Sequence, residues 1–316
     1  MITLTGSADA AGLLDAYRRL VESTGPGGLE SVEGHPQGAD LLALRRCVLA
    51  VAVLHDVDLV PDDDGVGLSS GRHVPWSSIQ LALGPIEATD PAARAVLAHW
   101  LLALRSVAWR SPDDLATRAR PVGLPRGHAL HPGASWVRHQ VPGGALDLGL
   151  GFVGTGADPD RVEILPAGVL EAVVSYPALL EDWWGSARHY LERMGALAAE
   201  RYHRRPAEPL RPMGDCDVAT LLGSAALRAA LCGHRGGLCA AAVPNRTRGW
   251  VDLSRTDPAF ALVAASLADA AERGFPRPLL VTRDEVAMAR EGGDPVLQSL
   301  RDRAAPDPVQ ALVPGR

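Results

Sequence analysis

Apolar residues recur at helical spacing through most of the first 120 residues. The spacing predicts helices over about 7–22, 40–55 and 90–110, and shorter ones after Pro75 and over 112–118. Asp90 followed by Pro91 is a typical helix start, because Asp caps the first turn and Pro suits its first position. The segment 57–68 instead predicts two short strands around an Asp-Asp-Gly turn. Because the 40–55 helix is apolar on nearly all sides after Arg46, we expect it to be buried.

The pattern changes after residue 120. The Pro- and Gly-rich stretch ARPVGLPRG, 119–127, predicts a loop and a boundary between a mainly helical region, 1–120, and an α+β domain, 128–294. Leu146, Leu148, Leu150 and Phe152 alternate with small or polar residues, which indicates a strand. With its neighbours, this strand predicts an antiparallel meander over about 135–165, and the fold is therefore expected to be α+β.

The later part of the chain predicts one long amphipathic helix over about 178–204. Its apolar stripe leaves His189, Glu192, Glu200 and His203 on the opposite face, which we expect to face solvent. A helix capped by Asp217 to about 231 should follow, then strands over 237–244 and 250–254 around a turn at 245–249. Helices over 257–273 and 283–293, a strand over 278–282 between them, and a loosely ordered tail, 295–316, complete the prediction.

Composition excludes several function classes. The net charge of −6 argues against general binding of nucleic acids or anionic membranes. The longest apolar run, Cys47 to Leu54, is too short to span a bilayer, and no basic, apolar leader precedes Arg18, so we expect a cytoplasmic protein. The sequence has no lysine, and its 31 basic residues are all arginine, which excludes PLP enzymes and P-loop NTPases. The abundance of Ala, Arg, Gly and Pro is typical of a GC-rich bacterial genome.

The stretch GLGFVG, Gly149 to Gly154, matches the G-x-G-x-x-G fingerprint of dinucleotide-binding proteins. That fingerprint requires a helix to begin at the third glycine, because the amides of its first turn hold the pyrophosphate. Here Thr-Gly-Ala-Asp-Pro-Asp follows Gly154, and the next segment has the alternation of a strand. We therefore expect no NAD or FAD site.

Three histidines lie within twelve residues and form the strongest candidate for catalytic chemistry. His128 and His131 on a loop and His139 on the next strand could bind zinc or iron, with Asp147 as a fourth ligand or a general base. The alternative is that His131 belongs to an ordinary turn and that His139 is a core histidine. Such a metal site would indicate a hydrolase or an oxygenase.

Other clusters predict binding rather than catalysis. Arginines gather at 201–205, and Arg246 and Arg248 on a predicted turn could hold a phosphate or carboxylate. Trp183, at the edge of the buried stripe of the long helix, could mark an interface. In CGHRGGLC, Cys232 and Cys239 are more typical of small buried side chains than of a zinc cage.

For each candidate catalytic cluster, a purely structural role explains the residues at least as well as catalysis does. The sequence therefore leaves open whether the protein is an enzyme. The leading hypothesis is a non-catalytic cytoplasmic adaptor or regulatory subunit that binds a protein partner and needs no cofactor. The alternatives are a metal-dependent enzyme that uses the histidine cluster and a binder of a small anionic metabolite that uses arginines.

Overall fold

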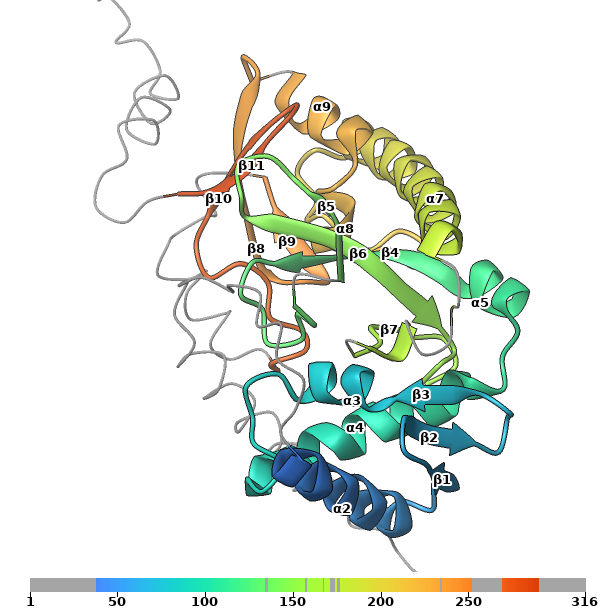
Figure 1. Cartoon of the computed structure of the whole chain (residues 1–316). Coiled ribbons are helices and arrows are strands. Elements are labelled where there is room, and N and C mark those ends of the chain that lie inside the picture. Colours follow the sequence, from blue (N-terminus) through green and yellow to red (C-terminus); the bar gives the residue numbers. More distant parts are fainter. Residues whose placement is uncertain are drawn as a thin grey trace, which may run out of the picture.

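The computed structural model describes residues 38–133, 136–156, 158–166, 168–170, 174, 177–233, 235–251 and 269–289. The predicted helix over 7–22 and the tail 295–316 lie outside these residues. So does the predicted helix over 257–273, apart from its last five residues, which form a turn. The described chain is an α+β fold, as predicted, with helices on both sides of a central antiparallel sheet (Figure 1).

The described N-terminal part, from residue 38 onward, confirms the hairpin and the helices predicted there. Asp90 caps its helix, because its side chain accepts a hydrogen bond from the Ala92 amide at 2.8 Å. A third strand, absent from the prediction, extends the hairpin to a three-stranded sheet. The elements are α2 (Gly38–Leu54), β1 (Leu59–Pro61), β2 (Gly65–Leu68), β3 (His73–Pro75), α3 (Trp76–Leu83), α4 (Pro91–Ala108) and α5 (Pro112–Arg118).

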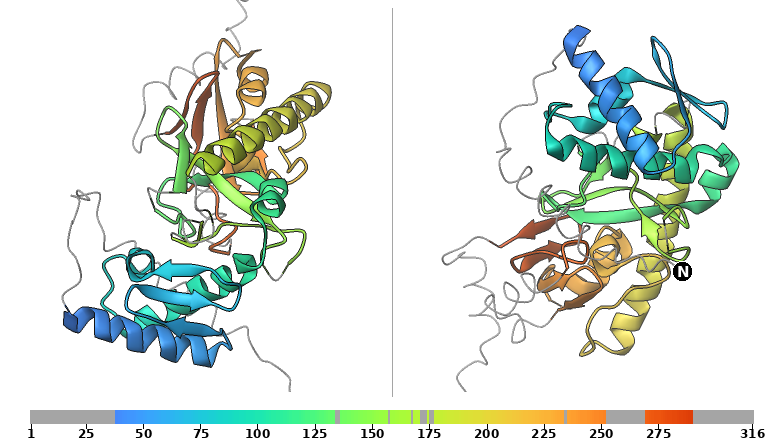
Figure 2. Two further views of the ribbon diagram at one scale, coloured as in Figure 1. Left: turned by 45° about the vertical axis from the view of Figure 1, so that its right-hand side comes forward. Right: turned by 90° about the horizontal axis from the view of Figure 1, so that it is seen from below.

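Helix α2 is less buried than its composition predicts. Val48 and Val51 are buried on the side that packs against α4, but Val53 and Leu54 are 82% and 72% exposed. The prediction of a buried helix was wrong for the side that carries Val53 and Leu54, since among the described elements α2 packs mainly against α4, at the edge of the described part of the molecule (Figure 2).

The central sheet contains β4 (Ala119–Pro125), β5 (Val137–Gln140), β6 (Leu146–Val153) and β7 (Val162–Glu163). The last three are the strands of the predicted meander, in which β5 and β7 each pair antiparallel with β6. Phe152 pairs with Ala119 on one side and Glu163 on the other, so β7 lies on the edge of β6 away from β4. The predicted loop over 119–127 was wrong, since most of it is β4. A proline-containing strand is tolerated here because β4 is an edge strand, which need not donate every amide to the ladder.

The two faces of β6 have different neighbours. Its leucines face the main core, whereas Gly149 and Gly151 face a second cluster built on Trp136. A Cβ atom on Gly149 would lie 2.3 Å from the Trp136 ring, so the indole occupies the space that any side chain would need. After Gly154, whose φ is +67°, the chain turns and returns as β7. A strand, not a helix, therefore follows the three glycines, as predicted.

The long helix is confirmed as α7 (Pro177–Arg204), and its predicted stripe from Leu180 to Tyr202 is buried. The predicted helix after Asp217 is divided into α8 (Val218–Leu221) and α9 (Ala225–Gly233). Glu192 explains the division, because its carboxylate accepts hydrogen bonds from the Ser224 hydroxyl at 2.8 Å and the Ala225 amide at 3.1 Å. We had expected Glu192 to face solvent, but it caps α9.

A second four-stranded sheet contains β8 (Leu238–Asn245), β9 (Arg248–Trp250), β10 (Leu279–Thr282) and β11 (Val286–Met288), in the order β11-β10-β8-β9. The predicted helix over 283–293 was wrong, since its described part contains a turn and β11. Two contacts explain the strand: the Thr282 hydroxyl accepts from the Glu285 amide at 3.0 Å, and the Val286 amide donates to the Pro142 carbonyl at 2.8 Å.

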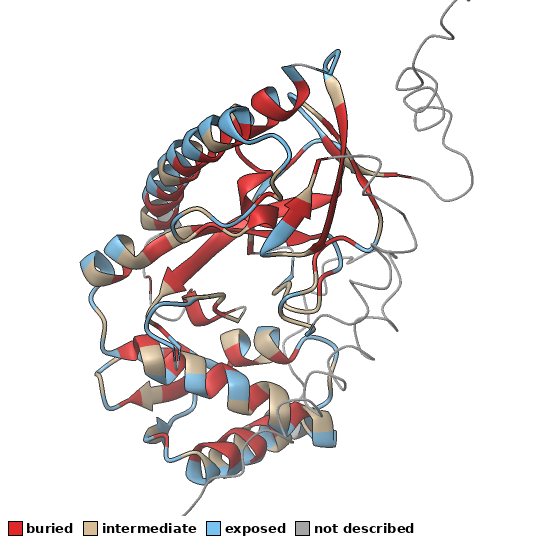
Figure 3. Ribbon diagram, turned by 180° about the vertical axis from the view of Figure 1, so that it is seen from behind, coloured by how far each residue is buried: buried red, intermediate tan, exposed pale blue. Residues whose placement is uncertain are grey.

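One connected set of buried apolar side chains joins these layers, from Leu44 in α2 to Val286 in β11. The buried residues are concentrated in the central strands and on the inward sides of the helices (Figure 3). None of the helices in the described ranges has the length and apolar character needed to cross a membrane.

Candidate functional site

His128 lies in a buried position after β4, with both ring nitrogens engaged. Its Nδ1 accepts a hydrogen bond from the Leu130 amide at 3.1 Å, which places the ring proton on Nε2. Nε2 then donates to the Arg273 carbonyl at 3.0 Å. Burial, reinforced by the charge of Arg246, lowers the pKa of His128 to about 4. The ring is neutral and offers no free lone pair to a metal ion.

The ring of His131, which lies in the same loop as His128, is held in the same way. Its Nδ1 accepts from the Gly133 amide at 3.1 Å, so its proton is on Nε2, which faces Asp147 Oδ2 at 3.3 Å. Burial lowers the pKa of His131, and the neighbouring Asp147 carboxylate opposes that shift. Asp147 Oδ1 is buried and has no hydrogen-bond partner among the described residues.

His139 is placed apart from this pair. It lies on β5, and a bulge between Val137 and His139 changes the strand register, so the side chain is exposed and does not belong to the core. The structure therefore brings together two of the four predicted ligands, His131 and Asp147. In the described part of the chain, no group of three or more His, Cys, Asp or Glu side chains is arranged to hold a metal ion. Zinc or iron binding stays a prediction.

We had expected the hairpin between β8 and β9 to present two free arginines, but only one of them is exposed. Arg246 forms a 2.6 Å ion pair with Asp217 and donates to the Ala271 carbonyl at 3.2 Å, and its side chain is only 13% exposed. Arg248 is exposed and lies over the Trp250 ring, 5.4 Å from its centroid. Arg246 is thus a structural residue, because Asp217 also caps α8 and fixes the guanidinium there.

Trp183 is also placed differently from the prediction. It is only 4% exposed and meets the Phe152 ring of β6 edge to face, with centroids 6.0 Å apart. The buried stripe of α7 thus includes both Trp183 and Trp184, and the interface role of Trp183 stays a prediction.

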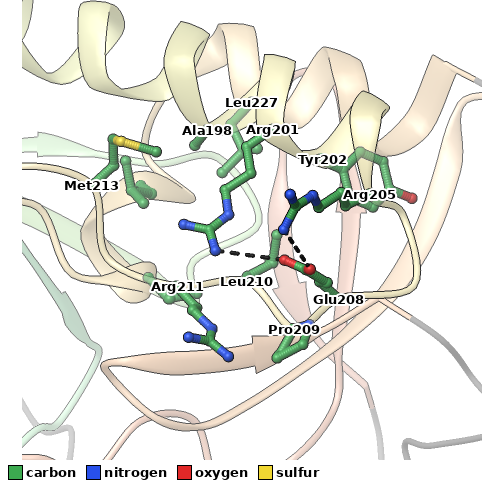
Figure 4. A pocket seen from close by; sticks show the side chains of 12 residues that line it. Ala198, Arg201, Tyr202, Arg205, Glu208, Pro209, Leu210, Arg211, Met213 and Leu227 are labelled. Carbon is green, nitrogen blue, oxygen red and sulfur yellow. Dashed lines mark hydrogen bonds and ion pairs between the residues drawn. The ribbon is translucent and has the colours of Figure 1, made fainter.

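A pocket opens where α7 ends and the chain returns toward α8 (Figure 4). Its floor is apolar and its rim is charged. The floor comes from Leu210, Val218, Leu221 and Leu227, with Ala198, Tyr202 and Met213 beside them. Arg201, Arg205, Glu208 and Arg211 form the rim. Arg201 lies in the last turn of α7 and Arg205 directly after it, where their positive charges complement the negative end of the helix dipole.

Within the rim, the Glu208 carboxylate lies between two guanidinium groups. Glu208 Oε1 is 3.0 Å from Arg205 and Oε2 is 3.5 Å from Arg201. The hydrogen bond from Arg205 lowers the pKa of Glu208 below its ordinary value. Arg211 stands on the other side of the pocket with its guanidinium in solvent (Figure 4). The rim therefore has three positive groups and one negative group.

The arginines at 201–205 are recognisable in the sequence, whereas the pocket is not. Its remaining rim residues, Glu208 and Arg211, lie in the proline-rich segment between α7 and α8. The signal available in the sequence was the spacing of Pro206, Pro209 and Pro212, which favours a chain that turns back rather than one that extends the helix.

Comparison of the chain with protein-family models, with curated proteins and with solved structures found no match.

Proposed function

We propose that this protein acts by binding, as a non-catalytic cytoplasmic adaptor or regulatory subunit. Its recognition site is the pocket at the end of α7, and its ligand is an acidic segment of a partner protein. A Glu or Asp side chain of the partner pairs with the arginines of the rim, while an apolar neighbour packs over the mouth of the pocket, whose cavity of about 20 Å³ is too small to take a side chain.

One observation carries this proposal: Glu208 already places a carboxylate between Arg201 and Arg205. The chain thus contains its own example of the group that the site would recognise. Arg211 remains beside it as a further positive group, on a rim whose floor is apolar. An acidic peptide that includes an apolar residue matches both properties, whereas a fully polar anion matches only the rim.

The metal-dependent alternative has weaker support. His128 and His131 each accept a backbone hydrogen bond on Nδ1 and direct the other nitrogen to an oxygen. A metal ion would have to displace one of these contacts. Metal analysis of the purified protein tests it: stoichiometric zinc or iron that is lost in a His128→Ala, His131→Ala double variant would revive this hypothesis.

Calorimetric titration of the full chain tests the binding proposal. The probe is a peptide with blocked termini in which one glutamate lies between leucines, so that its side chain is its one carboxylate. We expect saturable binding that weakens as salt is added, and no binding of the glutamine counterpart. Citrate serves as a second probe: tight binding of citrate with no binding of the peptide would favour a small anionic metabolite instead.

A further inference from the structure

Two cysteine thiols meet in the interior, at the two ends of a short exposed loop. Cys232 is in the last turn of α9 and Cys239 is in β8, and their sulfur atoms lie 3.9 Å apart. Both side chains are 2% exposed, whereas the described residues of the loop between them, Gly233 and 235–237, are exposed. A disulfide needs sulfurs about 2.05 Å apart, so a small movement of the loop would be enough to join them.

The surroundings favour Cys232 as the more reactive of the two. The pKa of the Cys232 thiol is lowered, first by its hydrogen bond with Cys239 and further by the nearby Arg228 and Arg235, although burial opposes the shift. The pKa of Cys239 is raised, because its hydrogen bond with Cys232 and its burial both favour the neutral thiol. Thiolate character is what makes a cysteine react with oxidants.

We propose that Cys232 and Cys239 are a redox site, which forms a reversible disulfide when the protein meets a hydroperoxide. The Cys232 thiolate attacks the peroxide O–O bond and becomes a sulfenic acid, releasing one oxygen as water or alcohol. The Cys239 sulfur then attacks Cys232 Sγ and expels the sulfenic oxygen as water. Two thiols lose two electrons and two protons, and the peroxide accepts them. A dithiol reductant reverses the reaction.

The other two cysteines provide an internal control. Cys47 and Cys216 are also buried and free, but each lies apart from any second thiol in the described part of the chain. Burial raises the pKa of Cys47, and burial raises that of Cys216 to about 12, with Asp217 and Asp215 adding to the effect. Burial alone therefore predicts that all four cysteines are inert, whereas this proposal predicts that one pair reacts.

The test treats the folded full-length protein with hydrogen peroxide, blocks remaining thiols by alkylation, and maps cysteines by mass spectrometry. We expect a 232–239 cross-linked peptide, lighter by two hydrogen atoms than the reduced pair, while Cys47 and Cys216 are alkylated. Dithiothreitol should restore the reduced mass. A wild-type protein whose 232 and 239 thiols are both alkylated after peroxide, or whose Cys232 is found as sulfinic acid, would overturn the proposal.

Two variants separate the steps. In Cys239→Ser the resolving sulfur is missing, so Cys232 should accumulate as a sulfenic acid that dimedone labels. In Cys216→Ala the cross-link should form as in the wild type. Circular dichroism establishes that each variant is folded. Equal dimedone labelling of Cys232 in wild type and Cys239→Ser would contradict the assignment of Cys239 as the resolving thiol.

Discussion

Glu208 extends its carboxylate to Arg205, with 3.0 Å between Oε1 and the nearer guanidinium nitrogen, in the mouth of the pocket at the end of α7. This ion pair is partly exposed, since the two side chains retain 37% and 67% of their accessible surface. Exposed pairs contribute little to stability. The position of Glu208 is therefore more informative about which group the rim accepts than about what holds the fold together.

Removing the charge of Glu208 should strengthen binding of an acidic peptide. In Glu208→Gln, Arg201 and Arg205 lose the internal carboxylate that competes with the ligand, and we expect affinity to rise about three- to tenfold. Calorimetry with the glutamate peptide measures this. Glu200→Gln is the matched control, because Glu200 pairs with Arg204 at 3.1 Å on the same helix but does not line the pocket. An equal gain in both variants would point to overall charge instead.

Arg246 should matter for stability and not for anion binding. Its ion pair with Asp217 is largely shielded from solvent, so Arg246→Met leaves a carboxylate without its partner, and we expect a loss of about 2–4 kcal/mol. Arg248→Met, at an exposed position two residues away, should cost less than about 1 kcal/mol. Urea denaturation compares the two variants. Equal stabilities would refute the structural role of Arg246.

Acid should destabilise the protein through His128. The pKa of His128 is about 4 in the folded chain, against an ordinary value of 6.5, because burial disfavours the charged ring. The unfolded chain therefore takes up the proton first as pH falls. The stability linked to the neutral ring is fully present above pH 6.5 and is lost as pH falls toward 4, by about 3 kcal/mol at most.

The His128→Asn variant checks this dependence, because asparagine does not titrate. Its unfolding free energy, measured by urea denaturation between pH 7 and pH 4, should fall less steeply than that of the wild type. Parallel curves for the two proteins would mean that other groups cause the acid sensitivity.

Gly149 should not tolerate a methyl group. In Gly149→Ala the new Cβ would lie 2.3 Å from the Trp136 ring, and relieving that overlap should cost about 1–3 kcal/mol. Gly185→Ala, on α7 with no atom near the new methyl group, should instead stabilise by about 0.5–1 kcal/mol. Opposite shifts in melting temperature are the expected result. A neutral Gly149→Ala would mean that Trp136 does not cover this face of β6.

The elements that sequence analysis predicted correctly have strong local signals. Helix α4 has its Asp90 cap and a regular apolar stripe, α7 has an apolar stripe from Leu180 to Tyr202, and β6 alternates leucine with glycine. The failures are β4 and β11, whose strand conformation depends on partners distant in sequence. Leu124 of β4 pairs with Asp147, and Val286 of β11 bonds to Pro142. No local pattern contains that information.

The candidate site shows the same limit. The sequence places Arg246 on a turn and gives no sign of a partner for its guanidinium. The partner, Asp217, comes from a different segment that only the fold brings close. The pocket escaped prediction because its floor joins Leu210, Leu221 and Leu227, which belong to a loop and two separate short helices. The cysteine cluster was correctly assigned as buried, but the spacing of Cys232 and Cys239 could not predict that their thiols meet.

The central claim is that the arginines of the pocket recognise a carboxylate. The most direct measurement is the difference in affinity between the glutamate and glutamine peptides for an Arg201→Gln, Arg211→Gln double variant. Arg188→Gln is the control, since Arg188 is exposed on α7 but lies outside the pocket. We predict that the double variant loses the preference for glutamate, by about tenfold or more, whereas Arg188→Gln retains it. A double variant that still prefers glutamate as strongly as the wild type would contradict the claim.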